Sequence, residues 1–387
     1  MKTHHQIYFQ NSKQMDALSS SSVDLVVTSP PYPMIEMWDD VFSGINPAIR
    51  NALNNAAGMD AFELMHHELD QVWEEVYRVL KEGGFACINI GDATRTMNGD
   101  FHLYTNHARI LSSLQKLGFS SLPAILWRKQ TNAPNKFMGS GMLPAGAYVT
   151  LEHEYVLIFR KGSKRQFEDT KDKKVRRESA YFWEERNIWF SDVWFDIKGT
   201  QQALGNKDTR SRSGAYPFEL AYRLIHMYSA KEDLVLDPFL GIGTSMAAAM
   251  AGGRNSIGYE IDPALEDIIG SIADVIVDFS NGYIRERIQR HIEFCADRIK
   301  EKGSLKHINK HYGFPVMTAQ EKDLLLNDVL EVNKAVQNGF TVVYSPKPQP
   351  EFCKDWLNVF ETGDYKQDFT KLDSNKTGHT QQKLFWK

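Results

Sequence analysis

The residues of this chain whose types and spacing best suit chemistry lie in one short turn, residues 28–32 (Thr-Ser-Pro-Pro-Tyr). The turn follows residues 23–27, an apolar run rich in valine that predicts a buried strand. Because each proline fixes φ and lacks an N–H, the strand must end here and the carbonyls of Ser29 and Pro30 lose their ladder partners. Together with the Ser29 hydroxyl and the flat Tyr32 ring, these carbonyls suit a planar heterocycle that carries an exocyclic amino group. The pentapeptide alone is equally compatible with an ordinary strand-ending turn.

A second pattern lies about 200 residues further along, at Asp237–Thr244 (Asp-Pro-Phe-Leu-Gly-Ile-Gly-Thr). It follows the apolar run 234–236 and precedes the alanine-rich segment 245–251, which predicts a helix. A strand, a glycine turn and a helix in this order form a cradle for a nucleotide-like cofactor. The next predicted strand, 255–259, ends at Glu260, at a separation suited to a carboxylate that binds a ribose diol.

The two patterns, in this order and each after a strand, resemble the amino-group DNA methyltransferases of the β arrangement, in which the catalytic half precedes the half that binds S-adenosylmethionine (AdoMet). The resemblance covers roughly residues 6–262. It implies a catalytic role for Ser29, Pro30, Pro31 and Tyr32. It implies cofactor binding by Asn11, Asp237, Phe239, Gly241, Gly243, Thr244, Glu260 and Ile261.

Asn11 departs from the family pattern, because an acidic residue usually stands at this strand end and contacts the adenine of the cofactor. An amide oxygen can still accept a hydrogen bond from an adenine amino group. The role therefore remains open for Asn11.

The resemblance implies an α/β fold of the Rossmann-like AdoMet-dependent methyltransferase type. We expect a mixed, mostly parallel sheet with helices on both faces, in circularly permuted order and with a mostly helical C-terminal appendage. The expected divisions are a catalytic half (1–162), a basic and aromatic insert that is a candidate DNA-contact region (163–209), an AdoMet-binding half (210–262), and a C-terminal candidate target-recognition or dimerisation module (263–387).

Periodicity predicts the elements that must position these residues. The most regular is an amphipathic helix at Glu68–Leu80, with apolar residues at helical spacing. The loop 131–148 is long enough to indicate a function, and in the family this region faces the target base. The other predicted strands are 6–10, 85–90, 125–127, 154–159 and 341–344, and the other predicted helices are 104–117, 219–229, 264–302 and 321–337.

Composition excludes several classes of protein. The chain has 387 residues, of which 42% are hydrophobic, enough for a sizeable core. No apolar run approaches the roughly 20 residues that span a bilayer, and residues 1–11 show no signal-peptide pattern. The three cysteines are far apart and form no Cys-x-x-Cys pair, which favours reduced thiols in the cytoplasm and argues against a zinc site or a disulfide framework.

A formal net charge of −4 excludes a uniformly basic nucleic-acid binder, so DNA binding would require a local concentration of positive charge. Residues 161–177 provide one, followed by the aromatic-rich segment 181–195. Such a pairing suits phosphate contacts and base stacking. A solvated loop followed by a small aromatic core is the simpler interpretation, and we favour it for each segment alone.

The predicted reaction is an in-line attack of an exocyclic amino nitrogen on the AdoMet methyl group. The Ser29 hydroxyl and the Pro30 carbonyl would accept the amino hydrogens and stabilise the developing positive charge. The base must be flipped out of the duplex, with Tyr32 stacked on it. Methylation at cytosine C5 is disfavoured, because enzymes of that class use a cysteine after proline and no cysteine here follows one.

In the resembling family a serine before Pro-Pro-Tyr goes mainly with cytosine N4, so Ser29 favours N4-cytosine over the alternative, N6-adenine. The expected partners are duplex DNA with a short recognition sequence and a cognate restriction endonuclease, for a monomer or homodimer. A more distant alternative is a nicotinamide-dependent dehydrogenase, but Met246 stands where its third glycine is expected. A third is a DNA-binding protein that has lost catalysis, against which the intact motif residues argue.

Overall fold

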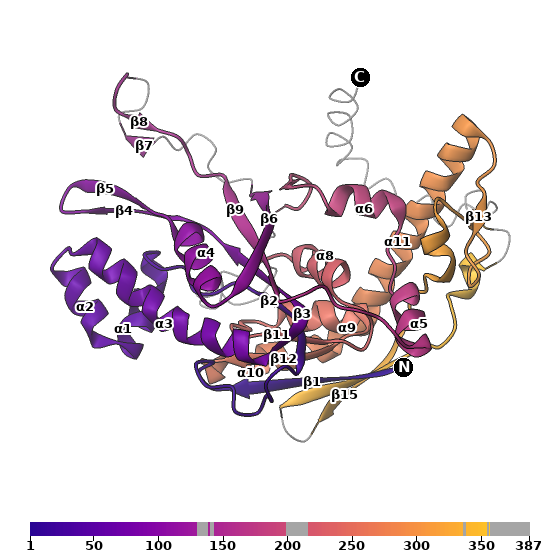
Figure 1. The fold of residues 1–387 in the computed structure, drawn as a ribbon, viewed down its shortest axis with the longest axis horizontal. Helices are drawn as coiled ribbons and strands as arrows, with labels where there is room; N and C mark the ends of the chain where they lie inside the picture. Colours follow the sequence, from indigo (N-terminus) through magenta and orange to yellow (C-terminus); the bar gives the residue numbers. More distant parts are fainter. Residues whose placement is uncertain (130–137, 140–142, 199–215, 336–337, 354–355, 357–387) are drawn as a thin grey trace.

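The computed structural model describes residues 1–129, 138–139, 143–198, 216–335, 338–353 and 356. Its centre is a ten-stranded sheet in the order β10-β6-β9-β3-β2-β11-β12-β1-β16-β15 (Figure 1). The strands are β1 (Lys2–Phe9), β2 (Val23–Thr28), β3 (Leu80–Ile90), β6 (Phe119–Arg128), β9 (His153–Lys161), β10 (Val193–Trp194), β11 (Leu234–Asp237), β12 (Asn255–Glu260), β15 (Val329–Ala335) and β16 (Gly339–Tyr344).

The five central strands, β3-β2-β11-β12-β1, are parallel to their neighbours. Strand β9 runs antiparallel between β3 and β6, and β16 and β15 add an antiparallel pair beyond β1. The register places Val235 opposite Leu25, so strands from distant parts of the chain are direct neighbours. The carboxyl ends of β2 and β11 therefore meet at one edge of the sheet, which we call the carboxyl edge. The expected mixed, mostly parallel α/β sheet is confirmed.

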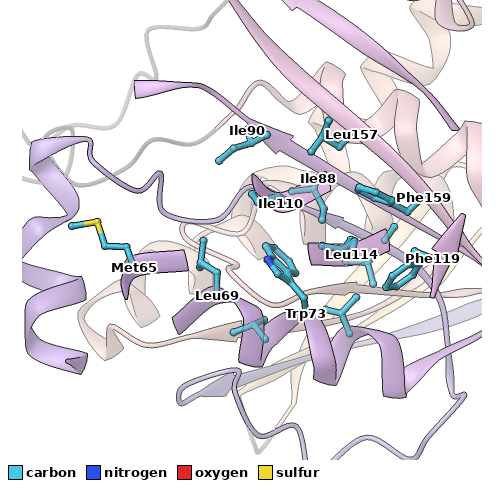
Figure 2. Packing of buried hydrophobic residues seen from close by; sticks show 14 of the residues in the cluster. Met65, Leu69, Trp73, Ile88, Ile90, Ile110, Leu114, Phe119, Leu157 and Phe159 are labelled. Atoms are coloured by element: carbon cyan, nitrogen blue, oxygen red, sulfur yellow. The ribbon is translucent and has the colours of Figure 1, made fainter. Parts of the chain in front are cut away.

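Helices cover both faces of this sheet. Helices α3 (Gly58–Val79) and α4 (Asn106–Lys116) pack on one face, and α8 (Phe218–Tyr228) and α9 (Thr244–Gly252) pack on the other. Side chains of β2 alternate accordingly, because successive residues of a strand point to opposite faces. Val26 belongs to the cluster around Trp73, whereas Leu25 and Val27 belong to the α8–α9 cluster. Figure 2 shows the first cluster, where Leu69 and Trp73 of α3 lie beside Ile88 of β3.

Shorter elements connect these layers. Two short helices, α1 (Asp39–Ile45) and α2 (Pro47–Asn54), follow the turn at residues 28–32, which we call the catalytic turn for its predicted role. The shorter elements of the described residues before α10 are η1 (Glu36–Trp38), α1 (Asp39–Ile45), α2 (Pro47–Asn54), β4 (Ala93–Met97), β5 (Asp100–Tyr104), β7 (Met138–Gly139), β8 (Ala147–Tyr148), α5 (Thr170–Glu178), α6 (Trp183–Trp189) and η2 (Pro263–Leu265).

The C-terminal region begins with α10 (Glu266–Gly270) and the long helix α11 (Ile272–Lys302), as predicted. The helix predicted at 321–337 is wrong: within that range lie the end of η3 (Ala319–Asp323) and strand β15. Residues there have fair helix propensity, but pairing with β16, which makes β15 the outermost strand of the sheet, overrides it. The predicted strand at 341–344 is confirmed within β16. The remaining short elements are β13 (His307–Ile308), β14 (Pro315–Val316) and η4 (Pro350–Phe352).

This region is joined to the main sheet, since β16 pairs with β1 from Lys2 to Gln6. The described helices include none with the length and apolar character that crossing a bilayer requires.

Candidate active site at the carboxyl edge

One hydrogen bond joins the two motifs that the sequence singled out. Thr28, the last residue of β2, donates its hydroxyl to Asp237 Oδ1 over 2.6 Å, and Asp237 is the last residue of β11. Ser29 follows Thr28 directly. The catalytic turn and the glycine turn therefore begin side by side at the carboxyl edge.

Asp237 is the anchor of the glycine turn. Its side chain is buried, with 3% of the residue exposed, and Oδ1 also accepts the Phe239 N–H at 3.0 Å. Oδ2 accepts hydroxyl hydrogen bonds from Ser245 of α9 and, at 3.5 Å, from Tyr216. Burial raises the pKa of Asp237, although these hydrogen bonds oppose the rise. The carboxyl group thus connects β2, the glycine turn, α9 and the segment before α8.

Glu260 ends β12 on the other side of the glycine turn. Its Oε2 accepts the Gly241 N–H and its Oε1 accepts the Asp262 N–H, each at 2.8 Å. Burial raises the pKa of Glu260, against the effect of these two bonds. Each carboxylate oxygen can accept a further hydrogen bond, which is what a ribose diol would require.

The glycines of this turn have different reasons to be glycine. Both have positive φ, +55° at Gly241 and +88° at Gly243. A Cβ on Gly243 would lie 2.6 Å from Ile272 Cδ1, so α11 packs against the backbone there. A Cβ on Gly241 would meet nothing within 4 Å, which leaves open space beside Glu260.

The remaining predicted cofactor residues lie around the carboxyl edge, but the side chain of one of them points into the core. Strand β1 pairs Phe9 with Glu260, which places Asn11 just beyond that edge, where its Oδ1 accepts the Lys13 N–H at 2.9 Å. Ile261 is 48% exposed, an uncovered apolar side chain that suits the face of an adenine. Thr244 is the first residue of α9. Phe239 instead turns toward the core and packs edge-on against Trp73.

These groups together fit AdoMet. A carboxylate with free lone pairs suits the ribose, an exposed apolar side chain suits the adenine, and the space beside Gly241 leaves room for the backbone of the turn to contact a ligand.

Two side chains of the catalytic turn and two from neighbouring strands form a connected set of hydrogen bonds. Ser29 Oγ donates to Tyr32 Oη at 3.2 Å, and Tyr32 Oη donates to Glu154 Oε2 at 2.9 Å. Asn89 Nδ2 donates to Tyr32 Oη at 2.8 Å and to Glu154 Oε2 at 2.7 Å. Burial and the charge of Glu154 raise the pKa of Tyr32 well above its ordinary value. Pro30 is buried and Pro31 is half-buried beside them.

Sequence reasoning missed Asn89 and Glu154. Asn89 is the polar residue inside the otherwise apolar run 85–90 of strand β3, which was an available signal. Glu154 lies near the start of β9 and had no such signal. Gly91 is also required here, because a Cβ on it would lie 2.9 Å from Tyr32 Cε2. Asp92 accepts the backbone N–H and ring Nδ1–H of His107 near the start of α4, so it caps that helix and is occupied away from the turn.

The basic segment begins at the opposite edge of the sheet. Lys161 Nζ donates to the carbonyls of Tyr77 and Leu80, at the start of β3. Arg165 forms an ion pair with Asp233, just before β11. These positions give no support to the segment as a DNA-contact region next to the catalytic turn. Residues 199–209 of the predicted insert lie outside the described residues, as do most of the loop 131–148 and the C-terminal 357–387.

The aromatic side chains after the basic segment mainly form a core, the simpler of the two predicted interpretations. Phe182, Trp189 and Trp194 are each less than 5% exposed. Phe190 and Phe195 remain exposed.

Among the described residues, one group of three side chains has ligand atoms close enough together for a metal ion: Glu184, His291 and Glu321. Its geometry is explained by an ion pair, since His291 Nδ1 lies 2.8 Å from Glu184 Oε1. Burial lowers the pKa of His291, but the charge of Glu184 outweighs it and raises the pKa to about 10. A protonated imidazole does not ligate a metal. Glu321 is held by the N–H groups of Trp183 and Thr318.

Comparison with known proteins identifies relatives of this chain. The family model N6_N4_Mtase, described as a DNA methylase, matches residues 23–271. Type II methyltransferase M.MthZI of Methanothermobacter thermautotrophicus is 53% identical over 360 residues, covering 93% of this chain and 100% of that protein. Type II methyltransferase M.MjaI of Methanocaldococcus jannaschii is 51% identical over 278 residues, covering 69% of this chain and 90% of that protein.

A solved structure is similar as well. A candidate DNA modification methylase of Thermus thermophilus, in complex with AdoMet, is 30% identical with a TM-score of 0.54. The match covers 70% of this chain and 96% of that one.

Proposed function

The chain belongs to the DNA methylase family, and we propose that within it the enzyme transfers the AdoMet methyl group to the N4 amino group of a flipped-out cytosine in duplex DNA. Membership of the family makes it a DNA methyltransferase of the Type II kind and removes the nicotinamide-dependent alternative. The base, the site residues and the partners are the parts that we propose.

The observation that carries the proposal is the hydrogen bond between Thr28 and Asp237. It ties the end of the strand that carries Ser29 to the start of the turn suited to AdoMet. An acceptor cluster and a methyl donor would then share one cavity, as transfer to an amino group requires.

When bound, AdoMet supplies an electrophilic methyl group on its sulfonium. Glu260 would hold its ribose, and the turn after Asp237 would hold the rest of it. Ser29 Oγ and the Pro30 carbonyl would accept the two amino hydrogens of the base, which aims the nitrogen lone pair away from them and toward the methyl group. The same acceptors stabilise the positive charge that develops on the nitrogen.

Tyr32 would stack on the flipped base. Its hydroxyl is held by Asn89 and Glu154, so the ring is fixed before the base arrives. A fixed ring reduces the ordering cost of binding.

The choice of cytosine rests on Ser29, the residue that in this family goes mainly with cytosine before Pro-Pro-Tyr. Adenine N6 is the alternative, since an adenine amino group needs the same acceptors. The proposed partners are a duplex with a short recognition sequence and a restriction endonuclease that cuts the same sequence.

The test is expression in a host without DNA methylation, followed by sequencing that detects modified bases and by nucleoside analysis. We expect N4-methylcytosine within one short recurring sequence. N6-methyladenine would overturn the choice of base, and 5-methylcytosine or unmodified DNA would overturn the proposed reaction.

A further inference from the structure

The hydrogen bonds of Tyr32 have only one consistent direction. A carboxylate only accepts, so Tyr32 must donate its single hydroxyl hydrogen to Glu154 Oε2 at 2.9 Å. Asn89 must present Nδ2 to this pair, because its oxygen would be repelled by Glu154 Oε2 at 2.7 Å. The Nδ2 group therefore donates to Tyr32 Oη at 2.8 Å.

Tyr32 Oη then has one lone pair left, and the neighbour that can fill it is Ser29 Oγ at 3.2 Å. Ser29 must use its hydroxyl hydrogen for this bond. Both lone pairs of Ser29 Oγ are then directed elsewhere, available to a ligand that donates.

We propose that Glu154, acting through Tyr32, sets the direction of the Ser29 hydroxyl and so makes the site selective for bases that present an amino group at this position. Glu154 is a positioning residue in this scheme, since it would act on the base only through Tyr32 and Ser29. The inference rests on the proposed function and names a determinant of its substrate class. A base with a carbonyl at the same position, such as uracil or hypoxanthine, would place an acceptor against an acceptor and be rejected.

Three features support a fixed arrangement. The hydroxyl of Tyr32 stays protonated at neutral pH because burial and the charge of Glu154 raise its pKa. Lys129 Nζ lies 3.0 Å from the other oxygen of Glu154, which helps to hold the carboxylate in place. Asn89 and Glu154 come from adjacent antiparallel strands, β3 and β9, so the sheet itself sets their separation.

The experiment compares two duplexes that carry the mapped recognition sequence with its target base opposite an abasic position, so that the cost of unpairing is equal. One carries the target base and the other its deaminated form: uracil for cytosine, or hypoxanthine if the mapped base is adenine. For the wild type with the AdoMet analogue sinefungin, we expect affinity for the amino base to be about tenfold higher or more.

Two variants remove the acceptor or the donor that sets this direction while keeping an aromatic ring at position 32: Tyr32→Phe and Glu154→Leu. In each, we expect the preference for the amino base to fall to about threefold or less, and single-turnover methyl transfer to slow by about 100-fold. Methyl transfer by the double variant should be no slower than by the slower single variant, because both substitutions interrupt the same chain of hydrogen bonds to Ser29. AdoMet affinity and the thermal midpoint report whether the fold is intact.

Glu152→Leu is the matched control, since Glu152 lies two residues before Glu154 and pairs with Arg128. It should leave the preference unchanged. An unchanged preference in Glu154→Leu, or additive losses in the double variant, would overturn the inference while leaving the proposed function intact. A wild type that methylates no DNA would instead overturn the proposed function.

Discussion

Buried carboxylates lie at the carboxyl edge of the central sheet and also at the opposite edge, where the parallel strands begin, which we call the amino edge. The two edges differ in whether these carboxylates are paired with a cation. At the amino edge, Asp24 accepts from Lys81 at 2.8 Å and Asp233 accepts from Arg165 at 2.6 Å. At the carboxyl edge, Asp237 and Glu260 accept only from hydroxyls and backbone N–H groups among the described residues, with no lysine or arginine within 4.0 Å.

The difference indicates which edge of the sheet is suited to bind a ligand. Paired charges are satisfied within the protein and mainly hold strands together. Two buried carboxylates without a cation beside them leave room for a cationic ligand to pair with them. AdoMet carries a sulfonium and an ammonium group, so the unpaired edge suits it electrostatically. Substitutions at the carboxyl edge should therefore impair function, and those at the amino edge should impair stability or nothing.

The largest expected effect is that of Ser29→Ala at the carboxyl edge. Removing one acceptor of the amino group should slow single-turnover methyl transfer by about 100- to 1,000-fold. AdoMet affinity, measured by calorimetry, should stay within about twofold of the wild type because Ser29 lies outside the glycine turn. An equal loss of both would mean that the catalytic turn is part of the cofactor site.

Glu260→Gln should weaken AdoMet binding by about tenfold, through loss of one charge-assisted hydrogen bond to the ribose. The pKa of Glu260 is raised by burial, so wild-type affinity should fall as the pH drops through it and the carboxylate is neutralised. The variant should lack this pH dependence. Calorimetry from neutral to mildly acid pH tests both points, and an unchanged affinity would remove Glu260 from the cofactor site.

Arg165→Met tests the comparison at the amino edge. The buried Asp233 loses its cation, so the free energy of unfolding should fall by about 2 kcal/mol. The transfer rate per folded molecule should stay within about twofold, because the amino edge takes no part in the reaction. Urea unfolding provides the measurement, and Lys164→Met, at an exposed neighbour, is the matched control. A variant of normal stability but low activity would reverse the assignment of the edges.

The smallest effect is expected for Lys171→Gln combined with Lys173→Gln on α5. Both side chains are exposed and belong to the basic segment that continues from the amino edge. DNA affinity should change by less than about twofold and its salt dependence should stay the same, since no phosphate contact is lost. Filter binding over a range of salt tests this. A tenfold loss with a shallower salt slope would place DNA on α5.

Much of the fold was predictable from local patterns. The runs 23–27 and 234–236 are valine- and leucine-rich, so both β2 and β11 were expected, and the prolines and glycines after them marked the turns. The segment 321–337 was not predictable in the same way. It becomes strand β15 because the exposed edge of the sheet, completed by β1 and β16, offers it partners.

The same distinction holds for the site. Ser29, Tyr32, Asp237 and Glu260 were each next to a strand end, where a short pattern identifies them. Asn89 and Glu154 are 65 positions apart, and Glu154 reaches Tyr32 across 122. Nothing in the local sequence around Glu154 indicates which ring its carboxylate will meet.

The sequence by itself determined the strand ends, the two turns and the identity of the acceptors, because proline, glycine and β-branched residues act on the backbone within a few positions of themselves. Only the tertiary structure decided which charges are paired and which are left for a ligand. Pairing depends on the order and direction of strands, and that order brings residues together from parts of the chain that no short pattern connects.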